Sequence, residues 1–285
     1  MSTYKEFYRR SIEQPEAFWG EQAELIDWHK PPQQICDYSK PPFVKWFSGG
    51  ETNLCHNAVD RHAAKRPNDR ALIYLSTETS EEKIYTFAEL KSEVMRMAAI
   101  YQSLGVRKGD RVLIYMPMIA EATFAILACA RIGAIHSVVF GGFASGSLAT
   151  RIDDAKPKLI VSSDAGMRGG KSVPYKHLLD DAIKLSQFPP EKVLMVDRGL
   201  DKAFNKVEGR DVDYATLRAR HMNAEVPCVW MESFAPSYIL YTSGTTGKPK
   251  GVQRDVGGYA VALAASMKHI YCGFEGETYF ATSDI

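Results

Sequence analysis

Glycines, hydroxyl residues and lysines are concentrated in one short segment, YTSGTTGKPKG at residues 241–251. Glycines let backbone N–H groups approach an oxyanion, hydroxyl groups donate further hydrogen bonds, and lysines supply positive charge. A polyphosphate is the ligand that calls for all three together. The segment follows a β-rich run at residues 237–240, which predicts a strand. We therefore predict a phosphate-binding loop at the end of that strand.

Two other interpretations of this segment compete. A P-loop of the G-x-x-x-x-G-K-[ST] type is excluded because Gly244 and Gly247 are too close together. Pro249 also stands where that motif needs a hydroxyl residue, and it lacks the N–H group that such a loop uses. A solvated, flexible turn is the second alternative, and two lysines fixed around a proline disfavour it.

A second group of basic residues and glycines is Arg168-Gly169-Gly170-Lys171, which precedes a predicted helix at residues 175–185. A guanidinium and an ammonium group beside two glycines can hold an exposed phosphate. An ordinary basic turn explains the same four residues, and on residue types alone it is the more frequent outcome. Both interpretations stay open at this point.

Several other polar side chains are predicted to have structural roles. His136 lies beside a predicted buried strand and has no assignable acidic partner. Asp153 and Asp154 share a predicted helix with basic neighbours, which predicts a solvated charged face. Cys129 lies in an apolar stretch and is predicted to be a small buried hydrophobe. Tyr259, in the helix expected after the glycine-rich segment, is predicted to pack in the core.

Short apolar strands and helices alternate along most of the chain, which predicts an α/β fold of βαβ units with parallel sheets and flanking helices. Thr86 and Glu89 form a capping-box pattern at the start of one helix, and Gly105 can end it. Ligands of such folds bind beyond the carboxyl ends of the strands. The predicted strands are residues 71–75, 83–85, 112–115, 137–140, 159–162, 193–196 and 238–241, and the predicted helices are residues 90–104, 119–132, 147–155 and 175–185.

The two ends of the chain differ from its middle. Residues 1–60 contain three tryptophans and two Pro-Pro pairs but little periodicity, so we predict an N-terminal appendage that covers a neighbouring surface. Residues 61–285 form the predicted main domain. A last strand is predicted at residues 278–281, and the sequence stops at Ile285. We therefore expect the main domain to be truncated on its C-terminal side.

Composition excludes several classes of protein. The chain has 285 residues, a formal net charge of +1 and 45% hydrophobic residues, which disfavours disorder and a dedicated nucleic-acid or anionic-membrane binder. The first residues contain no apolar segment of a secretory signal, and no run reaches the roughly 18 apolar residues of a membrane span. No two of the five cysteines have C-x-x-C spacing. We expect a reduced, cytoplasmic protein without nucleic-acid or membrane partners, and the oligomeric state is left open.

The segment at residues 241–251 resembles the phosphate-binding signature of the acyl-adenylate-forming superfamily, which includes acyl-CoA synthetases, luciferases and peptide-synthetase adenylation domains. YMPMIAEA at 115–122 and ACARIGAIHSVVFGGF at 128–143 resemble the acetyl-CoA synthetase branch. RGGKSVPYK at 168–176 and GVQRDVGGYAVALA at 251–264 are most similar to the propionyl-CoA synthetases of that branch. The resemblance covers essentially the whole chain, although members of the family continue well beyond its length.

The resemblance implies a two-step reaction that joins propionate, or another short-chain carboxylate, to coenzyme A. The carboxylate attacks the α-phosphate of Mg-ATP, forming acyl-AMP and releasing pyrophosphate, and the thiol of coenzyme A then displaces AMP. Because the first step brings an anion to a polyanion, positioning and charge neutralisation are the expected sources of catalysis. An acetyl-CoA synthetase and a non-catalytic CoA- or nucleotide-binding remnant are the alternatives.

The resemblance also implies site residues by their positions. The residues implied for ATP and pyrophosphate, with Lys248 as the catalytic one, are Thr242, Ser243, Gly244, Thr245, Thr246, Gly247, Lys248 and Lys250. The residues implied for coenzyme A are Phe140, Gly141, Gly142, Arg168, Gly169, Gly170 and Lys171. Core packing is an equal alternative for Phe140, and acetyl-specific relatives carry Arg at the position of Lys171.

Several parts of such an enzyme are implied to lie beyond residue 285: the adenine- and ribose-binding motifs, the magnesium-binding glutamate, the hinge aspartate and a C-terminal lysine. No metal ligand is therefore implied within this chain, although the whole enzyme would use ATP, Mg²⁺ and coenzyme A. We expect the 285-residue chain alone to be inactive.

Overall fold

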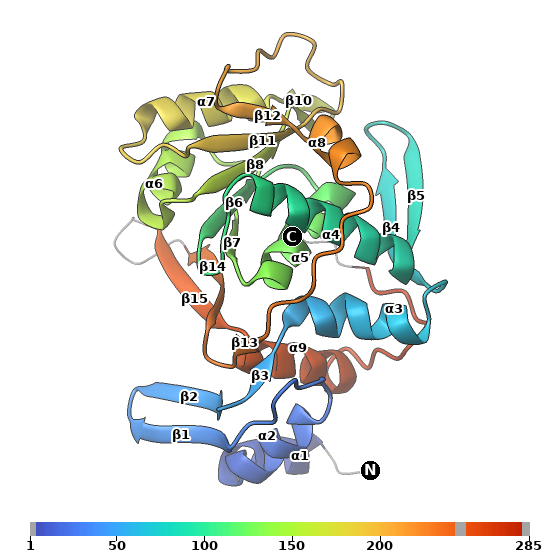
Figure 1. The fold of residues 1–285 in the computed structure, drawn as a ribbon. Helices are drawn as coiled ribbons and strands as arrows, with labels where there is room; N and C mark the ends of the chain where they lie inside the picture. The colour runs from blue at the N-terminus through green and yellow to red at the C-terminus, as the bar shows by residue number, and fades with distance from the viewer. Residues whose placement is uncertain (1–3, 243–248, 281–285) are drawn as a thin grey trace.

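The structure is a computed structural model that describes residues 4–242 and 249–280. Helices surround a central sheet, and a smaller N-terminal unit lies at one end of it (Figure 1). The helices are α1 (Tyr4–Glu13), α2 (Pro15–Ala23), the π-helix η1 (His56–Asp60), α3 (Arg61–Lys65), α4 (Phe87–Ser103), α5 (Ala120–Ile132), α6 (Ser145–Ala155), α7 (Tyr175–Leu185), α8 (Tyr214–Arg220) and α9 (Gly257–His269). The strands are β1 (Gln34–Lys40), β2 (Phe43–Ser48), β3 (Glu51–Thr52), β4 (Arg70–Ser76), β5 (Glu81–Thr86), β6 (Arg111–Tyr115), β7 (Ile135–Val138), β8 (Leu159–Ser163), β9 (Gly166–Arg168), β10 (Lys171–Val173), β11 (Lys192–Val196), β12 (Asp211–Asp213), β13 (Met231–Glu232), β14 (Pro236–Thr242) and β15 (Lys250–Asp255).

The central sheet has seven strands in the order β12-β11-β8-β6-β7-β14-β15. Neighbouring strands are parallel, except that β15 runs antiparallel to β14 at one edge. The chain passes from β6 to β7 on one side and then returns to place β8 on the other side of β6. In parallel sheets such a reversal opens a crevice beyond the carboxyl ends of the strands, where ligands bind. The fold therefore directs attention to the residues after β6, β7 and β8.

The sheet has one apolar cluster on each face, because successive side chains of a strand point to opposite sides. Ile114 of β6 packs with the helices α4 and α5, whereas its neighbour Leu113 packs with α6 and α7. Strands β6, β8 and β11 are buried on both faces of the sheet, which explains why their sequences are nearly continuous apolar runs. The predicted α/β fold with a parallel sheet is confirmed.

Helix boundaries follow the predicted signals closely. At the start of α4, Glu89 N donates to Thr86 Oγ1 at 3.2 Å and Thr86 N donates to Glu89 Oε2 at 2.8 Å, so the capping box is present. Gly105 follows α4 with φ +87°, and Gly133 ends α5 in the left-handed region with φ +72°. Both positions need a backbone that residues with a side chain rarely adopt.

The predicted strand at residues 278–281 is wrong over the part that the structure describes. Residues 278–280 are irregular, and Tyr279 and Phe280 are exposed. A short β-prone run forms a strand only when a neighbouring strand supplies hydrogen-bond partners, and the described residues supply none here. The sequence analysis also missed β15, which pairs with β14 along its whole length.

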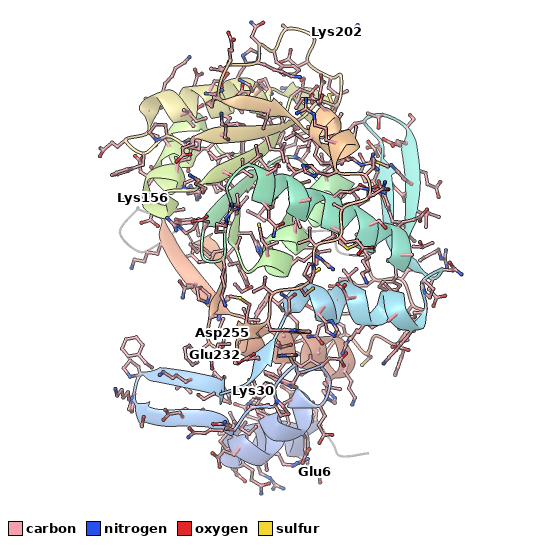
Figure 2. The ribbon with its side chains drawn as sticks, in the orientation of Figure 1. Glu6, Lys30, Lys156, Lys202, Glu232 and Asp255 are labelled. Carbon is pink, nitrogen blue, oxygen red and sulfur yellow. The ribbon has the colours of Figure 1, made fainter. Side chains whose placement is uncertain are left out.

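The N-terminal unit joins the rest of the chain through α9 and a short strand pair. Residues of α2 and β2, including Ala23 and Phe47, share an apolar cluster with Ala260 and Val261 of α9. Strand β3 pairs with β13, and Gly49 N donates to Glu232 Oε1 at 3.2 Å at the junction labelled in Figure 2. None of the described helices is long and apolar enough to cross a membrane.

Candidate active site

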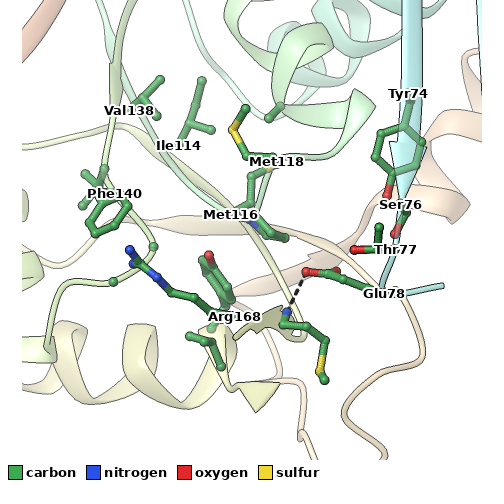
Figure 3. A pocket seen from close by; sticks show the side chains of 18 of the residues that line it. Tyr74, Ser76, Thr77, Glu78, Ile114, Met116, Met118, Val138, Phe140 and Arg168 are labelled. Carbon is green, nitrogen blue, oxygen red and sulfur yellow. Dashed lines mark hydrogen bonds between the residues drawn. The ribbon is translucent and has the colours of Figure 1, made fainter. Parts of the chain in front are cut away.

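A cavity of about 330 Å³ opens beyond the carboxyl ends of β6 and β7 (Figure 3). Its apolar lining includes the side chains of Ile114, Met116, Met118 and Val138. Its polar part is formed by Tyr74, Ser76, Thr77, Glu78 and Arg168. The cavity thus lies where the strand order reverses, which is the position that the fold predicts for a ligand.

The tip of the β4–β5 hairpin forms one wall of this cavity and is tied to the opposite side. Glu78 Oε1 accepts a hydrogen bond from Met167 N at 2.8 Å, the interaction dashed in Figure 3, and Oε2 accepts one from Arg198 Nη2 at 2.5 Å. Charge-assisted hydrogen bonds of this kind are among the stronger ones in proteins. Glu78 therefore fixes the hairpin relative to β9, and with it the width of the cavity.

Three residues of the predicted coenzyme A set meet at this cavity. The guanidinium of the exposed Arg168 lies 4.5 Å from the centre of the Phe140 ring, a cation–π arrangement. A Cβ atom added to Gly142 would lie 2.4 Å from Arg168 Nη1 and 2.5 Å from the Phe140 ring. Glycine is therefore required at position 142 for Arg168 and Phe140 to approach each other.

Gly141 is required for a different contact. A Cβ atom on this residue would lie 1.8 Å from Tyr175 Oη, so the tyrosine hydroxyl occupies the space that any side chain would need. Tyr175 begins α7, is 7% exposed and packs on Tyr115 with ring centres 4.9 Å apart. The sequence analysis missed Tyr175 as a lining residue, although its position beside RGGK was a signal that could have identified it.

The glycines of RGGK form the tip of a hairpin. Arg168 pairs with Lys171 between β9 and β10, and Gly169 and Gly170 have φ values of +55° and +76°. Two consecutive positive φ values are typical of a type I′ turn, which favours glycine at both positions. The turn interpretation thus accounts for both glycines, while Arg168 lines the cavity. Lys171 is exposed and is not among the described residues that line the cavity.

The predicted phosphate loop connects β14 to β15. Thr242 and Lys250 are opposite each other in the antiparallel pair, so the two strands hold the ends of the loop together. Ser243, Gly244, Thr245, Thr246, Gly247 and Lys248 lie outside the described residues. A strand, not a helix, follows the loop, which agrees with the exclusion of a P-loop because that motif leads directly into a helix.

A buried arginine that the sequence analysis did not single out links the segment after β7 to β14. Arg151 is 4% exposed, and its Nη1 donates to Ser147 O at 2.8 Å and Ser147 Oγ at 2.7 Å. Its guanidinium lies 4.1 Å from the Phe143 ring centre and 5.5 Å from that of Tyr241. Burial lowers the pKa of Arg151 from its ordinary value. Tyr241 Oη in turn donates to Asp154 Oδ2 at 2.6 Å.

The prediction that Asp153 and Asp154 lie on a solvated charged face agrees with the exposure of Asp154 but not with the half-buried position of Asp153. Asp154 is exposed but bonds to Tyr241, next to the predicted phosphate loop. Asp153 Oδ1 accepts hydrogen bonds from Ser186 Oγ, from Gln187 N at 2.8 Å and from Phe188 N at 3.1 Å. Helical periodicity placed these carboxylates on one surface but could not reveal that the chain after α7 returns to it.

His136 and Cys129 have the structural surroundings that the sequence predicted. Tyr259, predicted to pack in the core, is half-buried and belongs to none of the apolar clusters of the described residues. Burial lowers the pKa of His136 to about 4, so the ring is neutral at pH 7, and it stacks on Tyr238 with centres 5.3 Å apart. Tyr259 packs edge-on against the same tyrosine at 4.9 Å. Cys129 is fully buried. None of these three side chains lines the cavity formed by the described residues.

A metal site is not assigned near the cavity. In the part of the chain that the structure describes, Cys55, Asp60 and Cys228 are the one group of three potential ligands close enough to share an ion. That group contacts Arg131 in the last turn of α5, whereas the cavity is lined by Ala122 in the first turn of that helix. The magnesium ion that the resemblance implies thus has no assigned ligand among these residues.

Comparison with known proteins defines the class to which this chain belongs. The family of AMP-binding enzymes matches residues 59–285, and the acetyl-coenzyme A synthetase N-terminus family matches residues 4–58. Because the first match covers well over half of the chain, the chain belongs to the AMP-binding enzyme family. The resemblance inferred from the glycine-rich segment is confirmed.

Individual relatives narrow the comparison further. The chain is 64% identical over 283 residues to a propionate–CoA ligase of Salmonella typhimurium, covering 99% of this chain and 45% of that protein. It is 44% identical to the human mitochondrial acyl-CoA synthetase short-chain family member 3, covering 100% of this chain and 41% of that protein. An acetoacetyl-CoA synthetase structure from Streptomyces lividans superposes with a TM-score of 0.89 at 27% identity, covering 100% of this chain and 43% of that one. The chain therefore spans less than half the length of the relatives it matches.

Proposed function

We propose that this chain is the N-terminal portion of an AMP-forming acyl-CoA synthetase that activates propionate. The observation that carries the proposal is the identity of 64% to a propionate–CoA ligase along 99% of the chain. The reaction would form propionyl-AMP and pyrophosphate from propionate and ATP, and then propionyl-CoA and AMP. Residues 1–60 would be the appendage and residues 61–285 the truncated catalytic domain.

We propose that the loop between β14 and β15 holds the β- and γ-phosphates of ATP. Thr242 and Lys250 would contribute from its two ends, and Lys248 would neutralise the charge that develops as pyrophosphate leaves. The antiparallel pairing of β14 with β15 supports this assignment, because it brings Thr242 opposite Lys250. The other proposed contacts of the loop with the phosphates are the hydroxyl groups and backbone N–H groups of residues 243–247.

We propose that Arg168 and Phe140 contact coenzyme A at the cavity, with Gly142 allowing their close approach. An exposed guanidinium can bind a phosphate through two hydrogen bonds, and the aromatic ring beneath it offers an apolar surface to the adjoining part of the ligand. The cavity of about 330 Å³ lies within the size range of small-molecule sites. Gly169 and Gly170 would shape the hairpin that presents Arg168, and Lys171 would add positive charge beside it.

The rest of the catalytic apparatus would come from outside residues 1–285. The magnesium ligand belongs to that part by resemblance, so we propose Mg²⁺ as the metal of the whole enzyme and assign it no ligand here. A cytoplasmic location and the absence of nucleic-acid and membrane partners stay predictions.

A chimeric enzyme tests the proposal. Residues 1–285 would be joined to the remaining C-terminal part of the Escherichia coli propionate–CoA ligase, whose matching part is 63% identical. ATP–pyrophosphate exchange would then be measured with formate, acetate, propionate and butyrate, followed by thioester formation with coenzyme A. We expect exchange to be fastest with propionate, and we expect residues 1–285 alone to form no thioester. A folded chimera that binds nucleotide without exchange would favour the non-catalytic alternative. Because most residues that select the acid are implied to lie beyond residue 285, the acetyl-CoA synthetase alternative is tested by the same assay on the whole protein from which this chain derives.

A further inference from the structure

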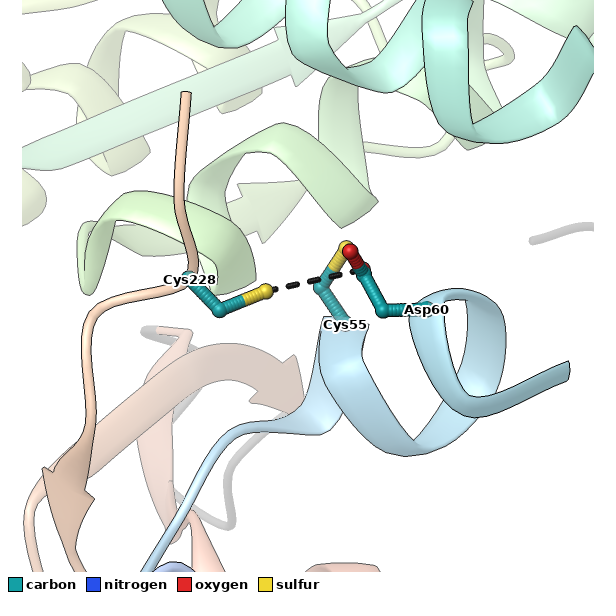
Figure 4. Close-up of side chains that lie close together, drawn as sticks. All are labelled: Cys55, Asp60 and Cys228. Carbon is teal, nitrogen blue, oxygen red and sulfur yellow. Dashed lines mark hydrogen bonds between the residues drawn. The ribbon is translucent and has the colours of Figure 1, made fainter. Parts of the chain in front are cut away.

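Two cysteines from distant parts of the chain meet at the C-terminal end of α5 (Figure 4). Cys55 directly precedes η1, and Cys228 lies in the extended segment between α8 and β13. Both sulfur atoms approach the same carboxylate oxygen, Asp60 Oδ2, at 3.8 Å from Cys55 and 3.6 Å from Cys228. The two sulfur atoms and this oxygen all lie within 4.8 Å of one another. Both thiols are free in the structure.

The backbone around this thiol pair is held in place by hydrogen bonds to the end of α5. Asn53 Nδ2 donates to Ala130 O at 2.7 Å and to Val229 O at 2.8 Å, which fixes the chain beside each cysteine. Val229 N donates to Arg131 O at 2.8 Å, and Arg131 Nε donates to Val226 O at 2.5 Å. The approach of the two chain segments that carry the cysteines is therefore built into the fold.

The charges around the thiol pair disfavour a bound cation. Arg131 donates to both carboxylate oxygens of Asp60 at 2.7 and 2.8 Å, and Lys91 Nζ lies 3.3 Å from Asp60 Oδ1. Arg131 Nη1 also lies 3.3 Å from Cys55 Sγ. The carboxylate is thus already paired with two cations, and a metal ion would be placed next to both of them.

We propose that Cys55 and Cys228 are a redox modification site that forms a reversible disulfide on exposure to a hydroperoxide. Cys55 is fully buried and Cys228 is half-buried, so the oxidant reaches Cys228 first. The Cys228 thiolate attacks one peroxide oxygen, which forms an S–O bond and breaks the O–O bond. After protonation the other oxygen leaves as water when the oxidant is hydrogen peroxide, or as an alcohol when it is an organic hydroperoxide. The Cys55 sulfur then attacks the sulfenic sulfur, which forms the S–S bond, breaks the S–O bond and releases the hydroxyl group, with the proton of the Cys55 thiol, as water. Two thiols are oxidised and one hydroperoxide is reduced.

The rate of this reaction should rise with pH. The hydrogen bond to Cys55 and burial together raise the pKa of the Cys228 thiol, Asp60 raises it further, and Arg131 opposes them. Lys91 also contacts Asp60, with its Nζ 3.3 Å from Oδ1. Because only the thiolate attacks the peroxide, the site reacts slowly at neutral pH and faster as the pH increases.

The disulfide would connect the segment before β13 to the start of η1. Strand β13 already pairs with β3, which precedes Cys55, so the covalent bond would reinforce an existing contact between remote segments. Closing a long loop reduces the freedom of the unfolded chain. Oxidation is therefore expected to raise the midpoint of thermal unfolding, on the order of 5 °C or more for a chain of this size.

Disulfide mapping tests the proposal on the 285-residue chain. The folded protein would be treated with hydrogen peroxide at pH 7 and pH 9, its remaining thiols blocked with N-ethylmaleimide, and its peptides analysed by mass spectrometry. We expect a peptide pair joined through Cys55 and Cys228, more of it at pH 9, and its complete loss on addition of dithiothreitol. The Cys228→Ala variant should lose the rise in the unfolding midpoint. The Cys36→Ala variant, which removes another buried cysteine, should retain it.

Two outcomes would overturn the proposal. One is oxidation of the folded chain that leaves Cys55 and Cys228 unlinked, or that links them no more often than the same treatment does in denaturant. The other is zinc that copurifies with the chain and is lost in the Cys228→Ala variant, which would make the group a metal site. Because mapping uses the unmodified sequence, it decides the question even if a cysteine variant fails to fold. Neither outcome depends on the acyl-CoA synthetase activity proposed above.

Discussion

Two arginines, Arg131 in α5 and Arg168 in β9, lie near opposite ends of helix α5 and are in opposite situations. At the C-terminal end, Arg131 is 2% exposed and forms a two-point ion pair with Asp60. At the N-terminal end, the cavity contains Arg168, which is exposed, stacks on Phe140 and has no carboxylate within 4.0 Å among the residues that the structure describes. Arg131 uses its N–H donors within the fold, whereas the N–H donors of Arg168 remain available to a ligand. The partners of each arginine thus distinguish a structural cation, Arg131, from one that can bind a ligand, Arg168.

Removal of the structural cation should have the largest effect. Arg131→Ala leaves Asp60 without its main partner in a largely buried position, and breaking a buried ion pair typically costs about 3–5 kcal/mol. Urea unfolding of the 285-residue chain measures the loss. Arg168→Ala removes the same charge from β9, beside the cavity, and serves as the control, with an expected change below about 0.5 kcal/mol. Equal losses from both variants would remove the distinction between the two arginines.

A second prediction concerns Lys248 in the predicted phosphate loop, a cation that, like Arg168, we expect to bind a ligand. In the chimeric enzyme, Lys248→Ala should remove a charge-assisted contact worth roughly 1.5–3 kcal/mol, which slows propionate-dependent pyrophosphate exchange about 10–100-fold. Lys268→Ala, on an exposed position of α9, is the matched control and should leave exchange unchanged. Unaltered exchange in the Lys248 variant would contradict the phosphate-loop assignment.

The Arg168→Ala variant should affect the two half-reactions differently. Because coenzyme A enters only in the second step, Arg168→Ala should raise the KM for coenzyme A about 10-fold and leave pyrophosphate exchange nearly intact. The effect of Lys171→Ala should be smaller, since its side chain does not line the described part of the cavity. A parallel fall in both half-reactions would instead assign Arg168 a structural role like that of Arg131.

The smallest expected effect is a pH-dependent change in the free energy of unfolding, caused by Asp60 at the C-terminal end of α5. Burial alone would raise the pKa of Asp60, but hydrogen bonding and charge from Arg131, together with Lys91, outweigh burial and lower it. A carboxyl whose pKa is lowered in the folded state stabilises the fold above its unfolded pKa of about 4 and loses this contribution as the pH falls through the folded value. The difference in unfolding free energy between the chain and its Asp60→Asn variant should therefore be constant above about pH 5 and shrink below pH 4. A difference that does not change between pH 6 and pH 3 would show that Asp60 is not charged in the folded chain.

The sequence by itself determined the features that depend on neighbouring residues. The capping box of Thr86 and Glu89, the ends of α4 and α5 at glycines and the strand before YTSGTTGKPKG are local, because each needs only residues within one turn or one strand. The same holds for the chemistry expected of the glycine-rich loop, since its donors and charges lie within eleven residues.

Only the tertiary structure decided which distant residues meet. Arg168 reaches Phe140 because β8 lies beside β6 and the following hairpin returns over the loop after β7, an arrangement set by strand order. Arg131 with Asp60, and Cys55 with Cys228, meet because remote segments pack on the end of α5. Residue types cannot reveal such contacts, since the free energy that forms them comes from burying whole faces of the sheet and its helices.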